Sequence, residues 1–202
     1  MFAPKPTAVL HVSPVRSPTH SVSSRTLVVV RHGITDWNAE ERLQGHIDVP
    51  LNEEGIGQAR ALRDSLASFD FNAIYSSPLS RAKQTAEIVA DRSKIRYDWR
   101  LAEINHGIWQ GMTKKEIASR WPDGWALWQR NPNLYTPDGG ESLFALEQRV
   151  RSFLQELEGS TILCVTHGQV IQTFFMVLQS RPVEELQQFS QQNAKVCVFN
   201  LQ

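Results

Sequence analysis

Two histidines occupy matching points of the sequence, each after a short apolar run and directly before a glycine. His32 follows Leu27–Val30 and Arg31, and His167 follows the run that ends at Val165. Apolar runs of this length are typical of buried strands. Side chains just past the carboxyl ends of parallel strands share one crevice, which is where open α/β sheets bind ligands. We therefore expect the two imidazoles to face each other.

Two arginines accompany these histidines. Arg31 directly precedes His32, and Arg81 follows the predicted strand at 73–76. A single arginine most often forms a surface ion pair of little energetic value. Four cationic or titratable groups at neighbouring strand ends instead predict an anion pocket, because the planar guanidinium matches phosphate oxygens in a bidentate manner. The glycine after each histidine lets the backbone approach a ligand closely.

The elements that must position these groups alternate between strand-like and helix-like patterns from Thr26 onward. Helices are predicted after an N-cap at Asn52 and after an N-cap at Ser77 with Pro78 at the first helical position. Further helices are predicted over 141–157 and 170–178, and strands over 27–30, 73–76, 161–165 and 195–201, the last as an edge strand. This alternation predicts an α/β fold with three α/β/α layers around a mainly parallel central sheet.

Composition narrows the function further. The chain has 202 residues with 21 Lys plus Arg and 21 Asp plus Glu. This length fits one soluble domain, and a net charge of zero argues against nucleic-acid or membrane partners. No apolar run is long enough for a membrane span. Cys164 and Cys197 lie in apolar runs, so buried free thiols are expected, with a disulfide between their strands as the alternative.

Residues 1–25 differ from the remainder of the chain. They contain three basic residues, no acidic residue and many prolines and serines. Such a segment is expected to be an extended or disordered tail, with a transit peptide or a misplaced start codon as alternatives. The main domain is then 26–202. A cytoplasmic location is expected, or a plastid or mitochondrion if the tail is a transit peptide.

Residues 26–202 resemble the histidine phosphatase superfamily, also called the phosphoglycerate mutase-like family. The matching segments, in chain order, are Arg31-His32-Gly33, Asp36-Trp37-Asn38, Arg42-Leu43-Gln44-Gly45, Asp48-Val49-Pro50-Leu51, Ser76-Ser77-Pro78-Leu79-Ser80-Arg81, Leu101-Ala102-Glu103, Gly107-Ile108-Trp109-Gln110-Gly111, Gly140-Glu141-Ser142 and Val165-Thr166-His167-Gly168. One departure is Ile34, where the family commonly has glutamate or another polar residue. This substitution makes the edge of the predicted anion pocket less polar at Ile34 but does not remove a catalytic group.

The resemblance implies roles for individual residues. His32 would be the nucleophile that becomes a transient phosphohistidine, and Glu103 would be the general acid and then the general base. The phosphoryl oxygens would be held by positive side chains, which here do what a metal does elsewhere. The implied phosphate-binding and substrate-binding set consists of Arg31, Asn38, Gln44, Gly45, Arg81, His106, His167 and Gly168.

The segment around Glu103 favours the phosphatase branch of the family. Within the family, phosphoglycerate mutases carry a longer insertion between the Arg81 region and the final His-Gly, and a Glu-Arg-His-Tyr-Gly-type stretch at the acid. This chain instead has Glu103-Ile104-Asn105-His106-Gly107, which resembles the compact phosphatases. An Ile-Asn-His-Gly segment is similar to metal-independent phosphoserine phosphatases, in which the histidine lies near the amino acid part of the substrate. His106 is therefore a candidate specificity residue; the alternative is a histidine that packs beside Trp109. A mutase and a non-catalytic phosphate-binding module remain the alternative functions.

A small helical cap is predicted over about 105–140. Trp121, Trp125 and Trp128 recur at helical spacing, which indicates packing against the sheet domain, and the family resemblance adds a role as a lid. The six histidines lack metal-ligating spacing, so no metal and no cofactor are predicted. The expected partner is a small phosphorylated metabolite, and a homodimer is left open.

Overall fold

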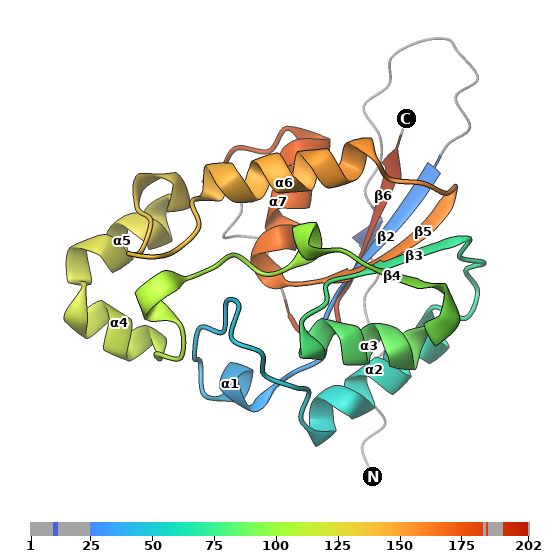
Figure 1. The fold of residues 1–202 in the computed structure, drawn as a ribbon, viewed down its shortest axis with the longest axis horizontal. Helices are drawn as coiled ribbons and strands as arrows, with labels where there is room; N and C mark the ends of the chain where they lie inside the picture. Colours follow the sequence, from blue (N-terminus) through green and yellow to red (C-terminus); the bar gives the residue numbers. More distant parts are fainter. Residues whose placement is uncertain (1–9, 12–24, 184, 186–191, 202) are drawn as a thin grey trace.

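A six-stranded sheet forms the centre of the computed structural model, which describes residues 10–11, 25–183, 185 and 192–201. Figure 1 shows the sheet between two layers of helices. The strand order is β1-β6-β2-β5-β3-β4. The strands are β1 (Leu10–His11), β2 (Arg25–Arg31), β3 (Ala73–Ser76), β4 (Ile95–Tyr97), β5 (Thr161–Thr166) and β6 (Val196–Leu201).

The sheet is mainly parallel, as predicted. β2, β5, β3 and β4 run parallel to one another, and only β6 pairs antiparallel, on β2. The prediction that β6 is an edge strand is wrong, because β1 pairs with its outer side in parallel. The rest of the predicted N-terminal tail, residues 1–9 and 12–24, lies outside the described residues.

Helices cover both faces of the sheet because β2 alternates its buried side chains between them. Val28 and Val30 pack towards α2 (Glu53–Ser65) and α3 (Ser80–Val89). Leu27 and Val29 pack on the opposite side, towards α6 (Leu143–Gln155) and α7 (Gly168–Gln179). This is the predicted three-layer α/β/α arrangement.

The start of α3 differs from the prediction. The expected cap at Asn52 is confirmed for α2, where its side chain accepts the Gly55 N–H at 2.9 Å. Ser77 does not cap α3, which begins at Ser80. Asp48 from a distant loop accepts the Ser80 N–H at 2.6 Å and the Ser80 hydroxyl at 2.7 Å. The Ser77 hydroxyl is therefore left for another partner.

Both cysteines are buried free thiols, as predicted. The alternative of a disulfide is wrong because Val29 of β2 lies between them, paired with Cys164 on one side and with Cys197 on the other. Two inter-strand spacings separate their backbones by roughly 9.5 Å, beyond the reach of a disulfide. In the described part of the chain, no helix is both long enough and apolar enough to cross a membrane.

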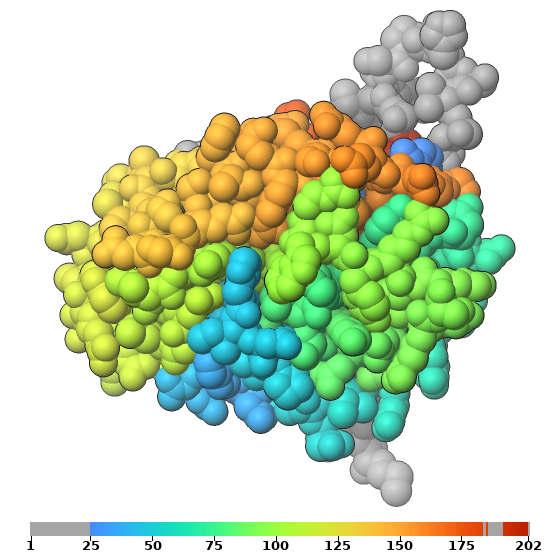
Figure 2. Space-filling view, in the orientation of Figure 1, coloured from blue at the N-terminus to red at the C-terminus, as the bar shows by residue number. Residues whose placement is uncertain are grey.

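Short helices between β4 and α6 form the cap, which lies to one side of the sheet in Figure 1. They are η3 (Gly107–Trp109), α4 (Lys114–Arg120), α5 (Pro122–Arg130) and η4 (Pro132–Leu134). Trp109 is fully buried and contacts the rings of Trp125, Trp128 and Tyr135. Figure 2 shows the loop after α1 (Asp36–Ala39) between this cap and α3.

Candidate active site

His32 and His167 face each other at the carboxyl ends of the adjacent strands β2 and β5, as predicted. Their ring centroids are 5.1 Å apart, with an angle of 59° between the ring planes. Both side chains are almost fully buried. Burial and the charges of Arg81 and Arg31 lower the pKa of both imidazoles well below the usual value. The pair is therefore neutral near neutral pH.

The backbone defines which nitrogen of His32 is reactive. The Nδ1 atom lies 2.7 Å from the Gly33 carbonyl oxygen. A carbonyl oxygen only accepts hydrogen bonds, so Nδ1 carries the proton and Nε2 carries the lone pair. The Gly33 N–H is held in turn by the Thr85 hydroxyl at 3.1 Å. His32 is thus a neutral imidazole whose lone pair is on Nε2, the nitrogen that could attack an electrophile.

Arg81 reaches this centre from the first turn of α3. It donates to the carbonyl oxygens of Ile47 at 3.0 Å and Gly45 at 2.7 Å. Its Nε is buried and has no hydrogen-bond partner among the described residues. Burial lowers the pKa of Arg81 to about 10, which leaves the guanidinium charged at neutral pH. Two backbone carbonyls thus orient a cation whose remaining N–H can donate to an anion.

Gly45 orients Arg81, and the contact with phosphate that the family resemblance implies for it stays a prediction. Its φ of +54° lies in the left-handed region, and a Cβ atom there would collide with the side chain of Gln110. The Gly45 carbonyl accepts a hydrogen bond from Arg81 and so helps to fix the position of that guanidinium. The neighbouring Gln44 is buried, and its Oε1 has no partner within the described residues.

Glu103 follows η2 (Trp99–Leu101) and faces the two arginines. Its carboxylate accepts the Ile104 N–H at 3.0 Å. Burial raises the pKa of Glu103 above the usual value, while that hydrogen bond and the charges of Arg81 and Arg31 oppose the rise. A carboxyl group with a raised pKa is suited to donate a proton and later to accept one.

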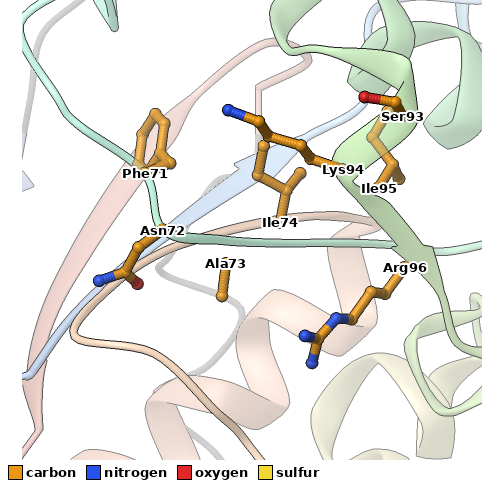
Figure 3. Close-up of a pocket in the computed structure, with 8 residues that line it drawn as sticks. All are labelled: Phe71, Asn72, Ala73, Ile74, Ser93, Lys94, Ile95 and Arg96. Carbon is orange, nitrogen blue, oxygen red and sulfur yellow. The ribbon is translucent and has the colours of Figure 1, made fainter.

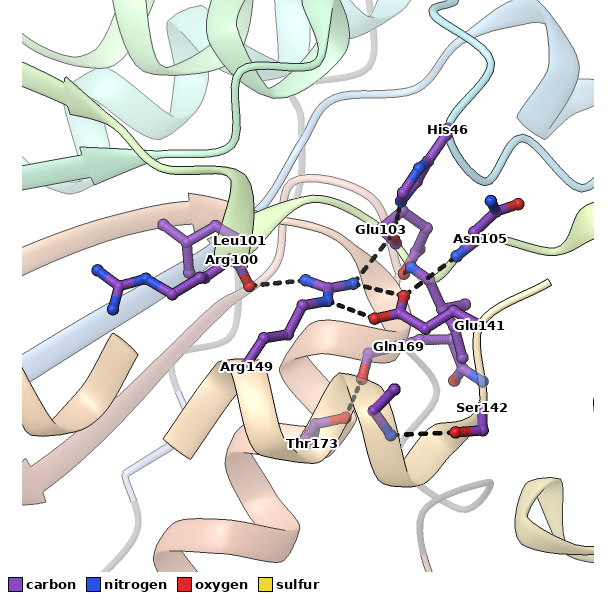
Figure 4. Close-up of polar contacts among 12 residues, drawn as sticks. His46, Arg100, Leu101, Glu103, Asn105, Glu141, Ser142, Arg149, Gln169 and Thr173 are labelled. Carbon is purple, nitrogen blue, oxygen red and sulfur yellow. Dashed lines mark hydrogen bonds and ion pairs between the residues drawn. The ribbon is translucent and has the colours of Figure 1, made fainter. Parts of the chain in front are cut away.

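Arg149 and Glu141 hold the backbone on which Glu103 lies (Figure 4). Arg149 donates to the two Glu141 oxygens at 2.7 and 3.0 Å, and both side chains are mostly buried. Its other N–H groups donate to the carbonyls of Arg100 at 2.6 Å and Glu103 at 3.2 Å. The Glu141 carboxylate also accepts the Asn105 N–H at 3.3 Å. Sequence patterns did not single out Arg149, because its partners lie far away along the chain.

Replacing Arg149 with lysine is expected to lower kcat by up to about 100-fold, the effect of a small displacement of a reacting group. An ammonium group keeps the charge but cannot bridge Glu141 and two backbone carbonyls at once. The measurement is steady-state hydrolysis of a phosphomonoester, together with inhibition by inorganic phosphate, which should stay unchanged. Arg151→Lys is the matched control, because Arg151 forms an exposed ion pair with Glu147 on the same helix. A lower melting temperature with an unchanged kcat would contradict the positioning role.

Asn38 helps to shape the loop over 32–35, between β2 and α1, which contains His32. Its Oδ1 accepts the Thr35 N–H at 3.1 Å in a capping box, and it also accepts from Asn193 at 3.2 Å. These contacts identify which atom of the Asn38 amide is the oxygen, and the amide nitrogen is the atom that can donate to a phosphate. Asn193, from the turn before β6, also donates to the carbonyls of His32 at 3.1 Å and Gly33 at 3.3 Å. Sequence reasoning missed Asn193, because no local pattern marks a turn residue that acts across the sheet.

The remaining predicted residues lie nearby. Gly168 is the first residue of α7, whose N-terminal end adds positive potential beside His167. His106 is buried and packs edge-to-face on Trp128, with ring centroids 5.6 Å apart, and its Nδ1 has no partner in the described ranges. Burial, His46 and Arg81 lower the pKa of His106 to about 4, so the ring is neutral.

A separate hollow of about 310 Å³ lies at the opposite, amino-terminal ends of β3 and β4 (Figure 3). Its lining includes Asn72, Lys94 and Arg96, none of which reaches the histidine pair. Within residues 10–11, 25–183, 185 and 192–201, no group of three His, Cys, Asp or Glu side chains could hold a metal ion.

Comparison with known proteins identifies relatives along nearly the whole chain. Phosphoserine phosphatase 1 of Hydrogenobacter thermophilus is 31% identical over 182 residues, which cover 87% of this chain and 86% of that protein. The metal-independent phosphoserine phosphatase of Arabidopsis thaliana is 36% identical over 159 residues, covering 74% and 67%. The solved structure of mycobacterial glucosyl-3-phosphoglycerate phosphatase is similar with a TM-score of 0.78 and 32% identity, covering 87% and 89% of the two chains.

The family model agrees with these similarities and with the site. The model of the histidine phosphatase superfamily (branch 1) matches residues 27–202, which contain both histidines, both arginines and Glu103. The chain therefore belongs to branch 1 of the histidine phosphatase superfamily.

Proposed function

We propose that this protein is a phosphatase that hydrolyses phosphomonoesters of small metabolites through a phosphohistidine on His32. The observation that carries the proposal is the hydrogen bond from His32 Nδ1 to the Gly33 carbonyl. It leaves an Nε2 lone pair on a buried ring that faces His167 and lies close enough to Arg31 and Arg81 for their charges to lower its pKa. Phosphoryl transfer needs a positioned nucleophile and neutralised oxygen charge, and these residues supply both.

The reaction has two steps. In the first, His32 Nε2 forms a bond to phosphorus while the bond to the leaving-group oxygen breaks, and Glu103 gives that oxygen its proton. In the second, the Glu103 carboxylate takes a proton from water, whose oxygen attacks phosphorus, and the bond to Nε2 breaks. Inorganic phosphate and the neutral imidazole are the result. Arg31 and Arg81 balance the charge of the phosphoryl oxygens in both steps.

The names of the relatives support a small substrate. Two relatives are named phosphoserine phosphatases, and others are named glucosyl-3-phosphoglycerate phosphatases. We propose phosphoserine as one substrate among small phosphomonoesters. His106 supports this proposal. It is a buried polar ring near enough to Arg81 for that charge to lower its pKa, and its Nδ1 has no hydrogen-bond partner among the described residues.

Replacing His106 with alanine is expected to raise KM for phosphoserine by about tenfold, the effect of one lost hydrogen bond to a charged group. Steady-state kinetics with phosphoserine and with p-nitrophenyl phosphate measure this effect. The second substrate lacks the amino acid part, so its KM should change little. Equal losses for both substrates would show that His106 only packs against Trp128.

A panel of phosphomonoesters assayed in EDTA tests the proposed function. Release of inorganic phosphate supports hydrolysis without a metal. Interconversion of phosphoglycerates without phosphate release would identify a mutase. Binding of phosphate without any turnover would identify a non-catalytic phosphate-binding module. Either of the last two results would contradict the proposal.

A further inference from the structure

Ser77 contacts the second histidine of the site. Its Oγ lies 2.8 Å from His167 Nε2, and both side chains are fully buried. The other ring nitrogen, Nδ1, is also buried and has no hydrogen-bond partner in the part of the chain that the structure describes. His167 therefore has one nitrogen held by the protein and one left for a ligand.

The partners of the Ser77 hydroxyl indicate where its proton goes. The Leu79 N–H donates to Ser77 Oγ at 3.3 Å, so this contact cannot accept the hydroxyl proton. Among the described residues, the other hydrogen-bond partner of Oγ is His167 Nε2. A hydroxyl group has one proton and two acceptor lone pairs. When Ser77 donates to Nε2, that nitrogen carries the lone pair and the proton of a neutral His167 is on Nδ1.

We propose that Ser77 is a positioning residue that holds His167 in the Nδ1–H tautomer, so that this histidine donates to a phosphoryl oxygen while uncharged. This inference rests on the proposed function, because the phosphoryl group is what receives the hydrogen bond. The tautomer matters because a neutral imidazole donates from only one nitrogen. A lone pair on Nδ1 would instead repel the oxygens of the substrate.

The two histidines of the site are thus held in the same Nδ1–H tautomer, but by different nitrogens: the protein holds Nδ1 of His32 and Nε2 of His167. His32 donates a hydrogen bond from Nδ1 to the Gly33 carbonyl, and its lone pair is on Nε2. His167 accepts a hydrogen bond at Nε2 from the Ser77 hydroxyl, and its N–H is on Nδ1. One imidazole then serves as nucleophile and the other as hydrogen-bond donor, and the site needs no second cationic ring at a centroid distance of 5.1 Å.

Long-range proton–nitrogen NMR of the histidine-labelled protein tests the proposal directly, with and without orthovanadate. Signals are assigned by their loss in His32→Ala and His167→Ala. The expected result is a protonated-type shift for His167 Nδ1 and a lone-pair-type shift for its Nε2. His32 of the free protein should show the same pattern, because its Nδ1 donates to the Gly33 carbonyl, and serves as the internal reference. A lone-pair-type Nδ1 on His167 in the vanadate complex would overturn the proposal.

Hydroxyl deletion provides the second test. Ser77→Ala is expected to lose the single tautomer of His167 and to lower kcat/KM by up to about 100-fold, since the loss of one preorganised donor costs about that factor or more. Ser76→Ala is the matched control, because Ser76 is equally buried but its hydroxyl donates to a backbone carbonyl. Ser77→Thr keeps a hydroxyl and should keep the tautomer. Unchanged NMR shifts and kinetics in Ser77→Ala would overturn the proposal.

The two readouts separate this inference from the proposed function. If no phosphomonoester is hydrolysed although His167 has the expected tautomer, the proposed function fails. If hydrolysis occurs and His167 carries its proton on Nε2, only the role of Ser77 fails. The wild-type NMR spectrum decides the matter even if Ser77→Ala does not fold.

Discussion

Replacing His32 with alanine is expected to lower kcat for phosphomonoester hydrolysis by about four orders of magnitude or more, as for other catalytic nucleophiles. The reason is geometric. The Gly33 carbonyl orients one imidazole nitrogen, and the other is the nucleophile that the buried cations surround. An alanine leaves only direct attack by water, which is not held in line with the leaving group.

Two measurements check this prediction. Phosphate release gives kcat. The phosphoenzyme is sought by reacting the protein with radiolabelled substrate and then quenching in base or in acid. A phosphohistidine survives the base quench but not the acid quench. His32→Ala should form no phosphoenzyme and should still bind orthovanadate through its arginines. Cys197→Ala is the control for a buried substitution on a neighbouring strand. Phosphate release at the wild-type rate from His32→Ala would rule out the mechanism.

Replacing Glu103 with glutamine is expected to lower kcat by about 10²- to 10⁴-fold for substrates with an alkyl leaving group. Such alkoxides leave slowly unless they receive a proton, and an amide cannot supply one. The loss should be much smaller for p-nitrophenyl phosphate, whose phenolate leaves without protonation. Comparison of the two substrates in the same variant measures the contribution of the acid.

The pH dependence has a definite sign. Burial raises the pKa of Glu103, and the first step needs its protonated form. Hydrolysis of alkyl phosphates by the wild type should therefore decrease as pH rises through that pKa, and Glu103→Gln should lack this decrease. Glu156→Gln is the matched control, since Glu156 forms an exposed ion pair with Arg100. Loss of activity that is equal for both leaving groups would contradict a role as general acid.

Features that depend on nearby residues were predictable from the sequence. The positions of His32 and His167 follow from apolar runs that end at a strand terminus, and the cap at Asn52 depends on a residue three positions away. Arg31, Arg81 and Glu103 came from spacing and family resemblance. The structure places all of these groups in one buried centre, although their roles remain predictions until the variants are measured.

Features that depend on distant residues were missed or wrong. Ser77 was predicted to cap α3, but Asp48 supplies that cap, and the Ser77 hydroxyl pairs with a histidine 90 residues away. The role of Arg149 depends on a carbonyl 46 residues away. β6 was predicted as an edge strand. Its pairing with β1 uses main-chain hydrogen bonds, which any residue can form, so no side-chain pattern indicates that pairing. Contacts between residues far apart in the sequence leave no local pattern from which they could be predicted.

The turn before β6 has a consequence for the newly synthesised protein. Asn193 donates to the carbonyls of His32 and Gly33, and β6 pairs with β2 along its length. On a ribosome these residues emerge after every other element described here, whereas the nucleophile emerges among the first. A nascent chain that stops before Asn193 lacks these hydrogen bonds and the pairing of β6 with β2, so we expect phosphatase activity to appear only after β6 has been translated.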